Sequence, residues 1–248
     1  MTTLVLSDPV DPSLLTDNPV RIIIMGRRAT GTSFASRFLT GTYDGKAWTI
    51  AERIKQISHA LIDQSGSLGD LLDVVILDKD LQTEAARQLL LYADTYEREP
   101  GLKPIRLYQD VGEILRHLDA STLYCWEQDL ERRILANPAP LTAIDVRAKE
   151  SHHYFADQRG YASLLMTASQ DVRERRMRDR DQHVITDPAA VNHVSETDVD
   201  HLDFDFVIDN DDDDPARLHA QLNGIVRQLV TTGKPFAASA PVHNEELT

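Results

Sequence analysis

A short segment with two glycines, at residues 26–33, follows the most apolar run near the start of the chain. That run, at residues 20–25, reads Val-Arg-Ile-Ile-Ile-Met, and its β-branched residues favour a buried strand. Residues 34–39 continue with a helical pattern. A buried strand, a glycine turn and a helix in this order predict an α/β protein built on a parallel sheet.

The segment reads Gly-Arg-Arg-Ala-Thr-Gly-Thr-Ser, which predicts a phosphate-binding loop. Its glycines let backbone N–H groups converge on phosphate oxygens, and the N-terminus of the following helix adds a favourable dipole. Ser33 provides the hydroxyl that usually binds Mg²⁺ in such loops, but Thr32 stands where a lysine is usual. Arg27 and Arg28 are candidates to replace the missing charge. The alternative is a tight turn that binds nothing.

The bulk composition is that of a globular protein. The chain has 248 residues, 42% of them hydrophobic and 27% charged, which suits one α/β domain with additions. The formal net charge of −14 argues against a DNA-binding surface, because a polyanion needs dense Lys and Arg. The single cysteine, Cys125, cannot form a disulfide within the chain. No apolar run is long enough to span a membrane, and the N-terminus lacks a basic region followed by an apolar stretch. We therefore expect a cytoplasmic protein without a membrane partner.

Periodic apolar residues divide the remainder of the chain into elements. Helical spacing appears in four stretches: residues 48–62, 83–98, 107–118 and 124–135. Strand patterns appear in three: residues 141–146, 162–167 and 204–208. Residues 65–80 fit either a strand or a helix. Alternation of strands and helices predicts a mostly parallel sheet flanked by helices.

The ends of the chain differ from this pattern. Asp214 and Pro215 predict the start of a last helix, with Asp as its N-cap and Pro in its first turn. We expect the folded domain to span residues 20–231. Residues 1–19 then form a flexible arm, and residues 232–248 form a disordered tail.

Two further groups of residues carry candidate chemistry. Asp145 ends a predicted strand, at the edge where open α/β sheets bind ligands, and Arg147 follows it. The alternative there is a local cap and salt bridge. Arg173, Arg176 and Arg180 lie three and four residues apart, so that a helix would place them on one face. Arginine suits forked contacts to phosphate, whereas the interleaved acidic residues favour a solvated face.

Other site patterns are missing from the sequence. No His/Cys spacing matches a zinc site. The acidic run at residues 211–214 lacks the glycine and terminal glutamate of a calcium loop, so it is interpreted as a solvated turn and helix cap.

Six segments, in the same order, resemble the bacteriophage-type deoxynucleoside monophosphate kinases, a branch of the adenylate-kinase-like P-loop fold. They are residues 26–33, 50–55, 108–116, 145–150, 193–196 and 205–210. Residues 50–55, Ile-Ala-Glu-Arg-Ile-Lys, are similar to the family's f-A-D-x-L-K, and residues 145–150 to its D-v-R-f-x-x-E. Residues 108–116 are similar to l-Q-x-x-G-x-x-x-R. The likeness spans about residues 20–230. It departs from the family at Thr32, where the family has Lys, at Ser33 and Phe34, where it has Asp-Thr, and at Glu52, where it has Asp.

The resemblance implies a three-layer P-loop kinase fold. In that fold, residues of about 48–136 form a helical acceptor-binding insertion, and residues of about 171–195 form an arginine-rich lid. The implied activity is transfer of the γ-phosphoryl group of ATP to a (deoxy)nucleoside monophosphate, including a modified one, in phage nucleotide metabolism. Such a transfer uses Mg²⁺ and depends on positioning and charge neutralisation.

Site roles follow by position from the resemblance. The ATP phosphates would contact Gly26, Arg27, Gly31, Thr32 and Ser33. The acceptor nucleotide would contact Lys55, Gln109, Arg116 and Glu150. Mg²⁺ would bind the Ser33 hydroxyl and, through water, Asp145. The catalytic set would be Arg28, Asp145, Arg147 and Arg176. The lid would carry Arg173, Arg176 and Arg180, and Asn210 would lie near the ATP base.

Other functions stay open at this stage. Thr32 favours a pseudokinase that binds nucleotide and acts as a sensor or partner-binding protein. A kinase for another small phosphate, or for a base within DNA, is a third hypothesis, and the net charge disfavours its DNA version. The Tyr- and Leu-rich helix around residues 83–96 offers a surface for a second copy, so a homodimer is also a hypothesis.

Overall fold

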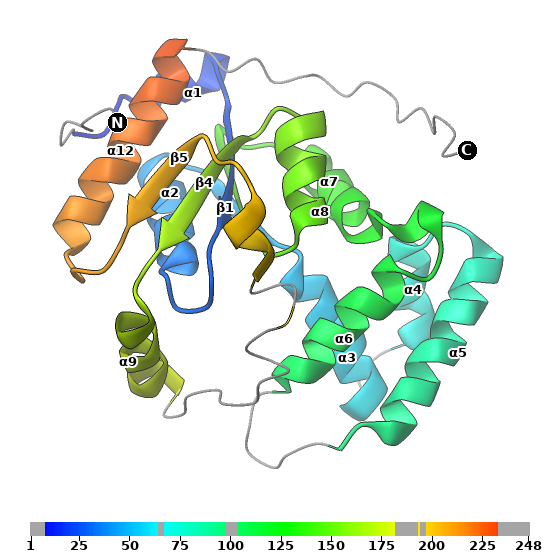
Figure 1. Cartoon of the computed structure of the whole chain (residues 1–248). Helices are drawn as coiled ribbons and strands as arrows, with labels where there is room; N and C mark the ends of the chain where they lie inside the picture. The colour runs from blue at the N-terminus through cyan, green and yellow to red at the C-terminus, as the bar shows by residue number, and fades with distance from the viewer. Residues whose placement is uncertain (1–7, 64–66, 98–103, 182–192, 194–196, 233–248) are drawn as a thin grey trace.

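Five parallel strands form the centre of the protein in a computed structural model that describes residues 8–63, 67–97, 104–181, 193 and 197–232 (Figure 1). The strand order is β2-β3-β1-β4-β5, and every pairing is parallel. The strands are β1 Val20–Met25, β2 Lys46–Thr49, β3 Leu141–Asp145, β4 Ala162–Thr167 and β5 Phe206–Asp209. The predicted mostly parallel sheet is confirmed.

The central strand β1 is buried on both faces, as its unbroken apolar run predicts. Its register pairs Ile24 with Asp145 of β3 and Met25 with Leu165 of β4. The carboxyl ends of three neighbouring strands therefore meet at one edge of the sheet, directly before the glycine segment.

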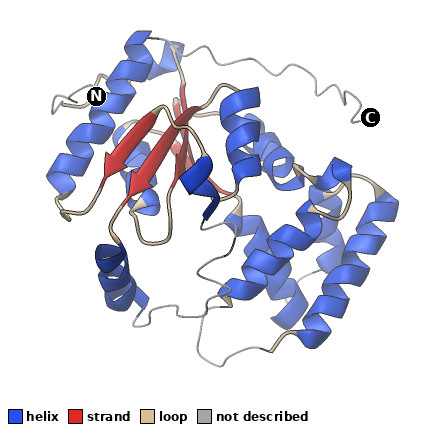
Figure 2. Ribbon diagram, in the orientation of Figure 1, coloured by secondary structure: helices blue, strands red, loops and turns tan. Residues whose placement is uncertain are grey.

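Helices cover both faces of the sheet, which gives three layers (Figure 2). Ile22 and Ile24 face one core, shared with α2 (Thr32–Thr42), α12 (Pro215–Thr232) and the short α1 (Leu14–Asp17). A hydrogen bond of 2.8 Å from Tyr43 Oη to Asn223 Oδ1 joins the segments of α2 and α12 within this layer.

Ile23 and Met25 face the opposite core, which is larger. Three elements pack there beside the sheet: α7 (Cys125–Ala136), α8 (Lys149–His152) and the π-helical η2 (His153–Gln158). Four helices extend the same core sideways: α3 (Ala51–Asp63), α4 (Leu68–Val75), α5 (Lys79–Thr95) and α6 (Ile105–Arg116). These helices occupy the segment for which a helical insertion is predicted.

Three short elements complete the described chain. The helix α9 (Gln170–Asp181) follows β4 and lies beyond its carboxyl end (Figure 1). The 3₁₀ turn η1 spans Ala120–Thr122, and η3 spans Asp198–His201. None of the described helices combines the length and apolar character needed to cross a lipid bilayer.

Some predicted boundaries are wrong. Residues 46–49 form the edge strand β2, so the predicted helix at 48–62 begins only at Ala51. The strand is short and half-exposed, and its four residues give no alternating signal against the strong helical spacing after them. The ambiguous stretch at 65–80 contains α4, whose N-cap Ser67 accepts a hydrogen bond from Asp70 N. The last predicted strand is shifted to Phe206–Asp209.

The two ends are only partly described. In the predicted arm, α1 places Leu15 in the core, and Asp8 O accepts a 2.8 Å bond from Arg227 Nη2. Residues 1–7 and 233–248 lie outside the described residues, as do residues 182–192 and 194–196 of the predicted lid segment.

Candidate functional site

The glycine segment folds as a tight loop between β1 and α2. Gly31 has φ of 106°, which a residue with a side chain rarely adopts, and Ala29 has φ of 65°. A Cβ on Gly31 would lie 2.6 Å from Asn210 Nδ2, and a Cβ on Gly26 would lie 2.5 Å from Met166 O. Glycine is therefore required at both positions by the backbone conformation or by close packing.

Backbone donors gather where the loop enters α2. Within the described part of the chain, the N–H groups of Gly31, Thr32 and Ser33 have no hydrogen-bond acceptor. The first intrahelical bonds begin one residue later, with Phe34 N and Ala35 N donating to Gly31 O at 3.0 Å each. Such free donors at a helix N-terminus attract an anion, because the helix dipole adds to their partial charges.

A carboxylate faces these donors from the neighbouring strand. The hydroxyls of Thr32 and Ser33 both donate to Asp145 Oδ2, at 3.2 Å each. The other carboxylate oxygen, Asp145 Oδ1, is buried and accepts no hydrogen bond from the described residues. Arg147 Nε lies 3.7 Å from Oδ1. The structure thus brings together the predicted Ser33 and Asp145, with one oxygen atom left to accept a further partner.

This oxygen set fits Mg²⁺. A hard divalent cation prefers carboxylate, hydroxyl and water oxygens, and it usually keeps several waters. Ser33 Oγ and Asp145 provide such oxygens beside the N-terminus of α2, and Asp145 Oδ1 has no hydrogen-bond partner among the described residues. No cluster of three His, Cys, Asp or Glu side chains suited to a metal occurs among the described residues.

Arg27, one of the two loop arginines, is engaged by an acidic side chain. Arg27 forms an ion pair with Asp200 of η3, and its Nε lies 3.3 Å from Asp200 Oδ1. Arg28 is half-buried and also has polar contacts. Thr32 is only 4% exposed, and its hydroxyl is directed to Asp145. In this conformation neither Thr32 nor Arg27 therefore offers an unpaired positive charge at the loop, whereas the N–H groups of Gly31, Thr32 and Ser33 have no acceptor among the described residues.

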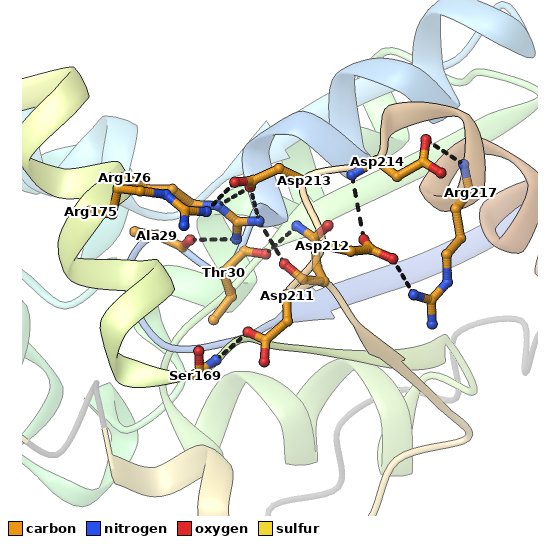
Figure 3. A network of polar contacts seen from close by, with 11 residues as sticks. Ala29, Thr30, Ser169, Arg175, Arg176, Asp211, Asp212, Asp213, Asp214 and Arg217 are labelled. Carbon is orange, nitrogen blue, oxygen red and sulfur yellow. Dashed lines mark hydrogen bonds and ion pairs between the residues drawn. The ribbon is translucent and has the colours of Figure 1, made fainter.

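Arg176 of α9 lies against the loop (Figure 3). Its Nη1 donates to Ala29 O at 3.2 Å, its Nη2 donates to Asn210 O at 2.6 Å, and its Nε donates to Asp213 Oδ1 at 2.8 Å. Arg175 forms an ion pair with the same Asp213. Hydrogen bonds from Arg176 lower the pKa of the Asp213 carboxyl below its ordinary value.

The other two predicted lid arginines have different surroundings. Arg173 Nε donates to Ala168 O, at 3.2 Å, near the start of its own helix. Arg180 is exposed in the last turn of α9. Of the three arginines predicted to share a helix face, only Arg176 is shown in contact with the loop. The lid role of all three stays a prediction.

Asn210 supports the loop from beneath. It is buried, and its Nδ2 donates to Thr30 O at 2.9 Å. Its backbone N–H donates to Thr167 O at 3.0 Å, at the end of β4. The Nδ2 of Asn210 is therefore bound to the loop, and the expected contact of Asn210 to the ATP base stays a prediction.

The predicted acceptor residues lie on the helical side. Lys55 is exposed on α3, Gln109 is half-buried on α6, and Glu150 is half-buried on α8. Arg116 differs from the others, because it is 4% exposed and forms an ion pair of 2.9 Å with the fully buried Glu127. Burial alone would lower the pKa of Arg116, but the charge and hydrogen bonds of Glu127 outweigh burial and raise it. In this structure the guanidinium of Arg116 is thus bound within the protein, and its contact to the acceptor stays a prediction.

The acidic run at residues 211–214 was expected to be solvated, apart from its cap. The cap is confirmed, since Asp214 Oδ1 accepts a 2.9 Å bond from Ala216 N. Asp211 and Asp213, however, bind Ser169 N and the two arginines of α9. Four adjacent identical residues carry no pattern that separates these partners, so the sequence offers no signal for this network.

Comparisons with known proteins identify no family. No known protein family matches the sequence, and no curated protein matches it. Among solved structures, "TT1252" from Thermus thermophilus is similar over 88% of this chain and 100% of its own, with 15% identity and a TM-score of 0.47. A dephospho-CoA kinase from Campylobacter jejuni is similar over 85% of this chain and 97% of its own, with 12% identity and a TM-score of 0.41. Both TM-scores are below 0.5.

The fold and the site define a class. A parallel sheet flanked by helices, with a glycine loop between its central strand and a helix N-terminus, is the arrangement of a P-loop protein. The departure from that class is Thr32 at the lysine position.

Proposed function

We propose that this protein is a nucleotide kinase that transfers the γ-phosphoryl group of ATP to a (deoxy)nucleoside monophosphate, including a modified one. The observation that carries the proposal is the segment at 26–33, where the N–H groups of Gly31, Thr32 and Ser33 have no acceptor among the described residues and the Ser33 hydroxyl binds the incompletely bonded Asp145. A polyphosphate with its divalent cation matches both halves of this arrangement.

Each of these residues would have its own role in phosphoryl transfer. The loop N–H groups would bind the phosphate tail, and Ser33 and Asp145 would hold Mg²⁺, the latter through water. The bound ion would neutralise charge on the phosphate oxygens. Arg147, which lies beside Asp145, and Arg176, which lies at the loop, would contact the transferring group. Positioning and electrostatic stabilisation account for most of the catalysis in such reactions.

The acceptor would bind on the helical side, against α3, α6 and α8. Lys55, Gln109 and Glu150 are the residues we retain for this role. Arg116 is left out, because Glu127 and Leu123 O already take its donors. Phage nucleotide metabolism, which comes from the resemblance, and a cytoplasmic location, which comes from the composition, are part of this proposal.

A second function is favoured by the charges at the loop. Thr32 provides no ammonium group, and Arg27 is paired with Asp200. Loss of one charge contact to a transition state lowers the rate by about 10²–10³. A pseudokinase that binds nucleotide with little turnover therefore remains the alternative.

One pair of measurements separates these functions. Isothermal calorimetry with Mg·ATP tests binding, and ADP release across a panel of nucleoside monophosphates tests turnover. Binding with turnover on one acceptor supports the kinase, and binding without turnover on every acceptor supports the pseudokinase. Folded protein that binds no nucleoside triphosphate refutes both.

The cation site has a matched pair of variants on one helix. Ser33→Ala removes the hydroxyl next to Asp145, and we expect Mg²⁺-dependent ATP affinity to fall by about tenfold or more. Thr40→Ala removes a hydroxyl that bonds only backbone carbonyls of the same helix, at 3.0 Å to Ser36 O. Equal effects of the two variants would remove Ser33 from the proposed site.

A second copy of the chain is a proposed partner. Leu90 and Leu91 of α5 are 54% and 55% exposed and lie side by side on the helix predicted for this contact. Leu91→Glu should convert a dimer to a monomer in light scattering after gel filtration. A monomeric wild-type protein at high concentration would refute the proposal.

A further inference from the structure

Each carboxylate of the acidic run at residues 211–214 has a defined partner (Figure 3). Asp211 Oδ1 accepts a 2.5 Å bond from Ser169 N, and Asp214 caps α12. Asp212 forms an ion pair with Arg217, within the turn and α12, whereas Asp213 forms ion pairs with both Arg175 and Arg176 of α9. Asp212 and Asp213 are thus neighbouring acids whose partners lie in different parts of the molecule.

Arg176 connects Asp213 to the glycine loop. Of its five guanidinium N–H groups, four donate to oxygens: two to Asp213, one to Ala29 O and one to Asn210 O. A guanidinium held in this way is fixed in direction, because its donors form a rigid planar fork. One N–H of Nη1 remains for a ligand at the loop.

The carbonyls that this network holds determine where the loop donors point. In a trans peptide the C=O and the following N–H point in opposite directions. Asn210 Nδ2 binds Thr30 O, so the N–H of Gly31 is directed away from Asn210, to the face where it has no acceptor in the described chain. Arg176 binds the carbonyl of Asn210 and that of Ala29, and so holds the supporting residue and the loop together.

The backbone of Asp213 supports a specific role. Its φ is 50°, in the left-handed region that is uncommon for residues other than glycine, asparagine and aspartate. Glycine would adopt this conformation without cost, but only a carboxylate there pairs with the two arginines.

We propose that Asp213 is a positioning residue of the nucleotide site, which acts through Arg176 to hold α9 and the loop in the phosphate-binding arrangement. The inference rests on the proposed function. It adds a residue that contacts no phosphate itself and determines whether Arg176 stays at the loop.

The test compares Asp213→Asn with Asp212→Asn, a neighbouring change of equal charge. We expect Asp213→Asn to weaken Mg·ATP binding by about tenfold in calorimetry, because a charged hydrogen-bond pair is lost. Asp212→Asn should stay within about twofold of the wild type, because its arginine lies away from the loop. Asp213→Glu keeps the charge, and we expect it to recover most of the affinity.

A second measurement needs no nucleotide. Hydrogen exchange of residues 170–181 in the unliganded protein should be faster in Asp213→Asn than in Asp212→Asn, because α9 loses its tie to the loop. Melting temperatures of the two variants, measured in parallel, should agree. A large fall in melting temperature for Asp213→Asn alone would assign a purely structural role and overturn the inference.

The outcomes separate the inference from the proposed function. If the wild type binds Mg·ATP and the two variants bind equally, Asp213 has no positioning role, and the proposed function stands. If the wild type binds no nucleoside triphosphate, the proposed function and the nucleotide role of Asp213 both fail. Equal exchange of residues 170–181 in both variants would also overturn the structural tie.

Discussion

Arg116→Met tests whether Arg116 serves the fold or the acceptor. In the structure, Arg116 Nη2 lies 2.9 Å from Glu127 Oε1, and Arg116 Nη1 donates to Leu123 O at 2.8 Å. Glu127 is fully buried, and besides Arg116 it accepts a 2.5 Å bond from Ser151 Oγ. Removing the arginine therefore leaves a buried carboxylate with one hydroxyl partner.

The expected loss of stability follows from that burial. Breaking a buried ion pair by removing one partner costs about 3–5 kcal/mol, because the remaining charge is uncompensated. For a chain of this size, each kcal/mol lowers the melting temperature by about 2–4 °C. We therefore expect Arg116→Met to melt roughly 6–20 °C below the wild type.

Calorimetric or circular-dichroism melting provides the measurement, and a double-mutant cycle provides the control. Glu127→Leu should be destabilising to a similar extent, and the double variant should lose much less than the sum of the two. The Ser151 hydroxyl then loses its acceptor, which leaves a residual cost of about 1–3 kcal/mol. An unchanged melting temperature with a raised KM for the acceptor would refute this reasoning and return Arg116 to the acceptor site.

Three further predictions concern the loop and the buried thiol. Gly31→Ala places a side chain on a residue with φ of 106°, so we expect it to lower the free energy of unfolding by about 1–3 kcal/mol and to abolish ATP binding. The control is Gly41→Ala in α2, where an added Cβ meets only open space. In the same melting and binding assays this control should be neutral or stabilising. Thr32→Lys restores the usual ammonium group and should raise kcat by a factor of about 10²–10³ in an ADP-release assay. An unchanged rate in the folded variant would show that the absence of the lysine does not limit turnover. Burial raises the pKa of the Cys125 thiol, so Ellman's reagent at pH 8 should label it only after unfolding in guanidinium, and rapid labelling of native protein would contradict its burial.

Local signals determined which parts of the fold could be predicted from sequence. The strands Val20–Met25 and Ala162–Thr167 have strong apolar runs that are buried on both faces, and both predicted ranges agree with the structure. The edge strand Lys46–Thr49 was missed, because an exposed edge needs no apolar pattern. The pairing of β1 with β3, rather than local composition, places Asp145 beside Ser33. The sequence points to both residues only because each adjoins a recognisable motif.

Side-chain pairing between distant segments had no such signal. Charged residues on helices are usually exposed to solvent, so the sequence predicts a solvated segment both for the α9 arginines and for the acidic run, with no contact between them. Their contact depends on the pairing of β4 with β5, which brings Thr167 opposite Asp209 and so places the turns after both strands side by side. Sequence spacing alone does not contain that register.

Three of the arginines around the loop share one property that bears on the choice between the two functions. Arg27 pairs with Asp200, Arg147 lies near Asp145, and Arg176 is bound by Asp213, so that each cation has a carboxylate beside it. A phosphate that enters the loop must therefore attract an arginine in competition with its carboxylate, or rely on the backbone N–H groups and Mg²⁺. Of these three pairs, Arg27–Asp200 is the most exposed, so that solvent screens its attraction most, whereas Arg147 and Asp145 are joined by the longest contact, 3.7 Å. Release of Arg27 from Asp200, or of Arg147 from Asp145, is the change that would supply the absent lysine's charge, and a loop that keeps both pairs when nucleotide binds would act as a binding site without efficient transfer.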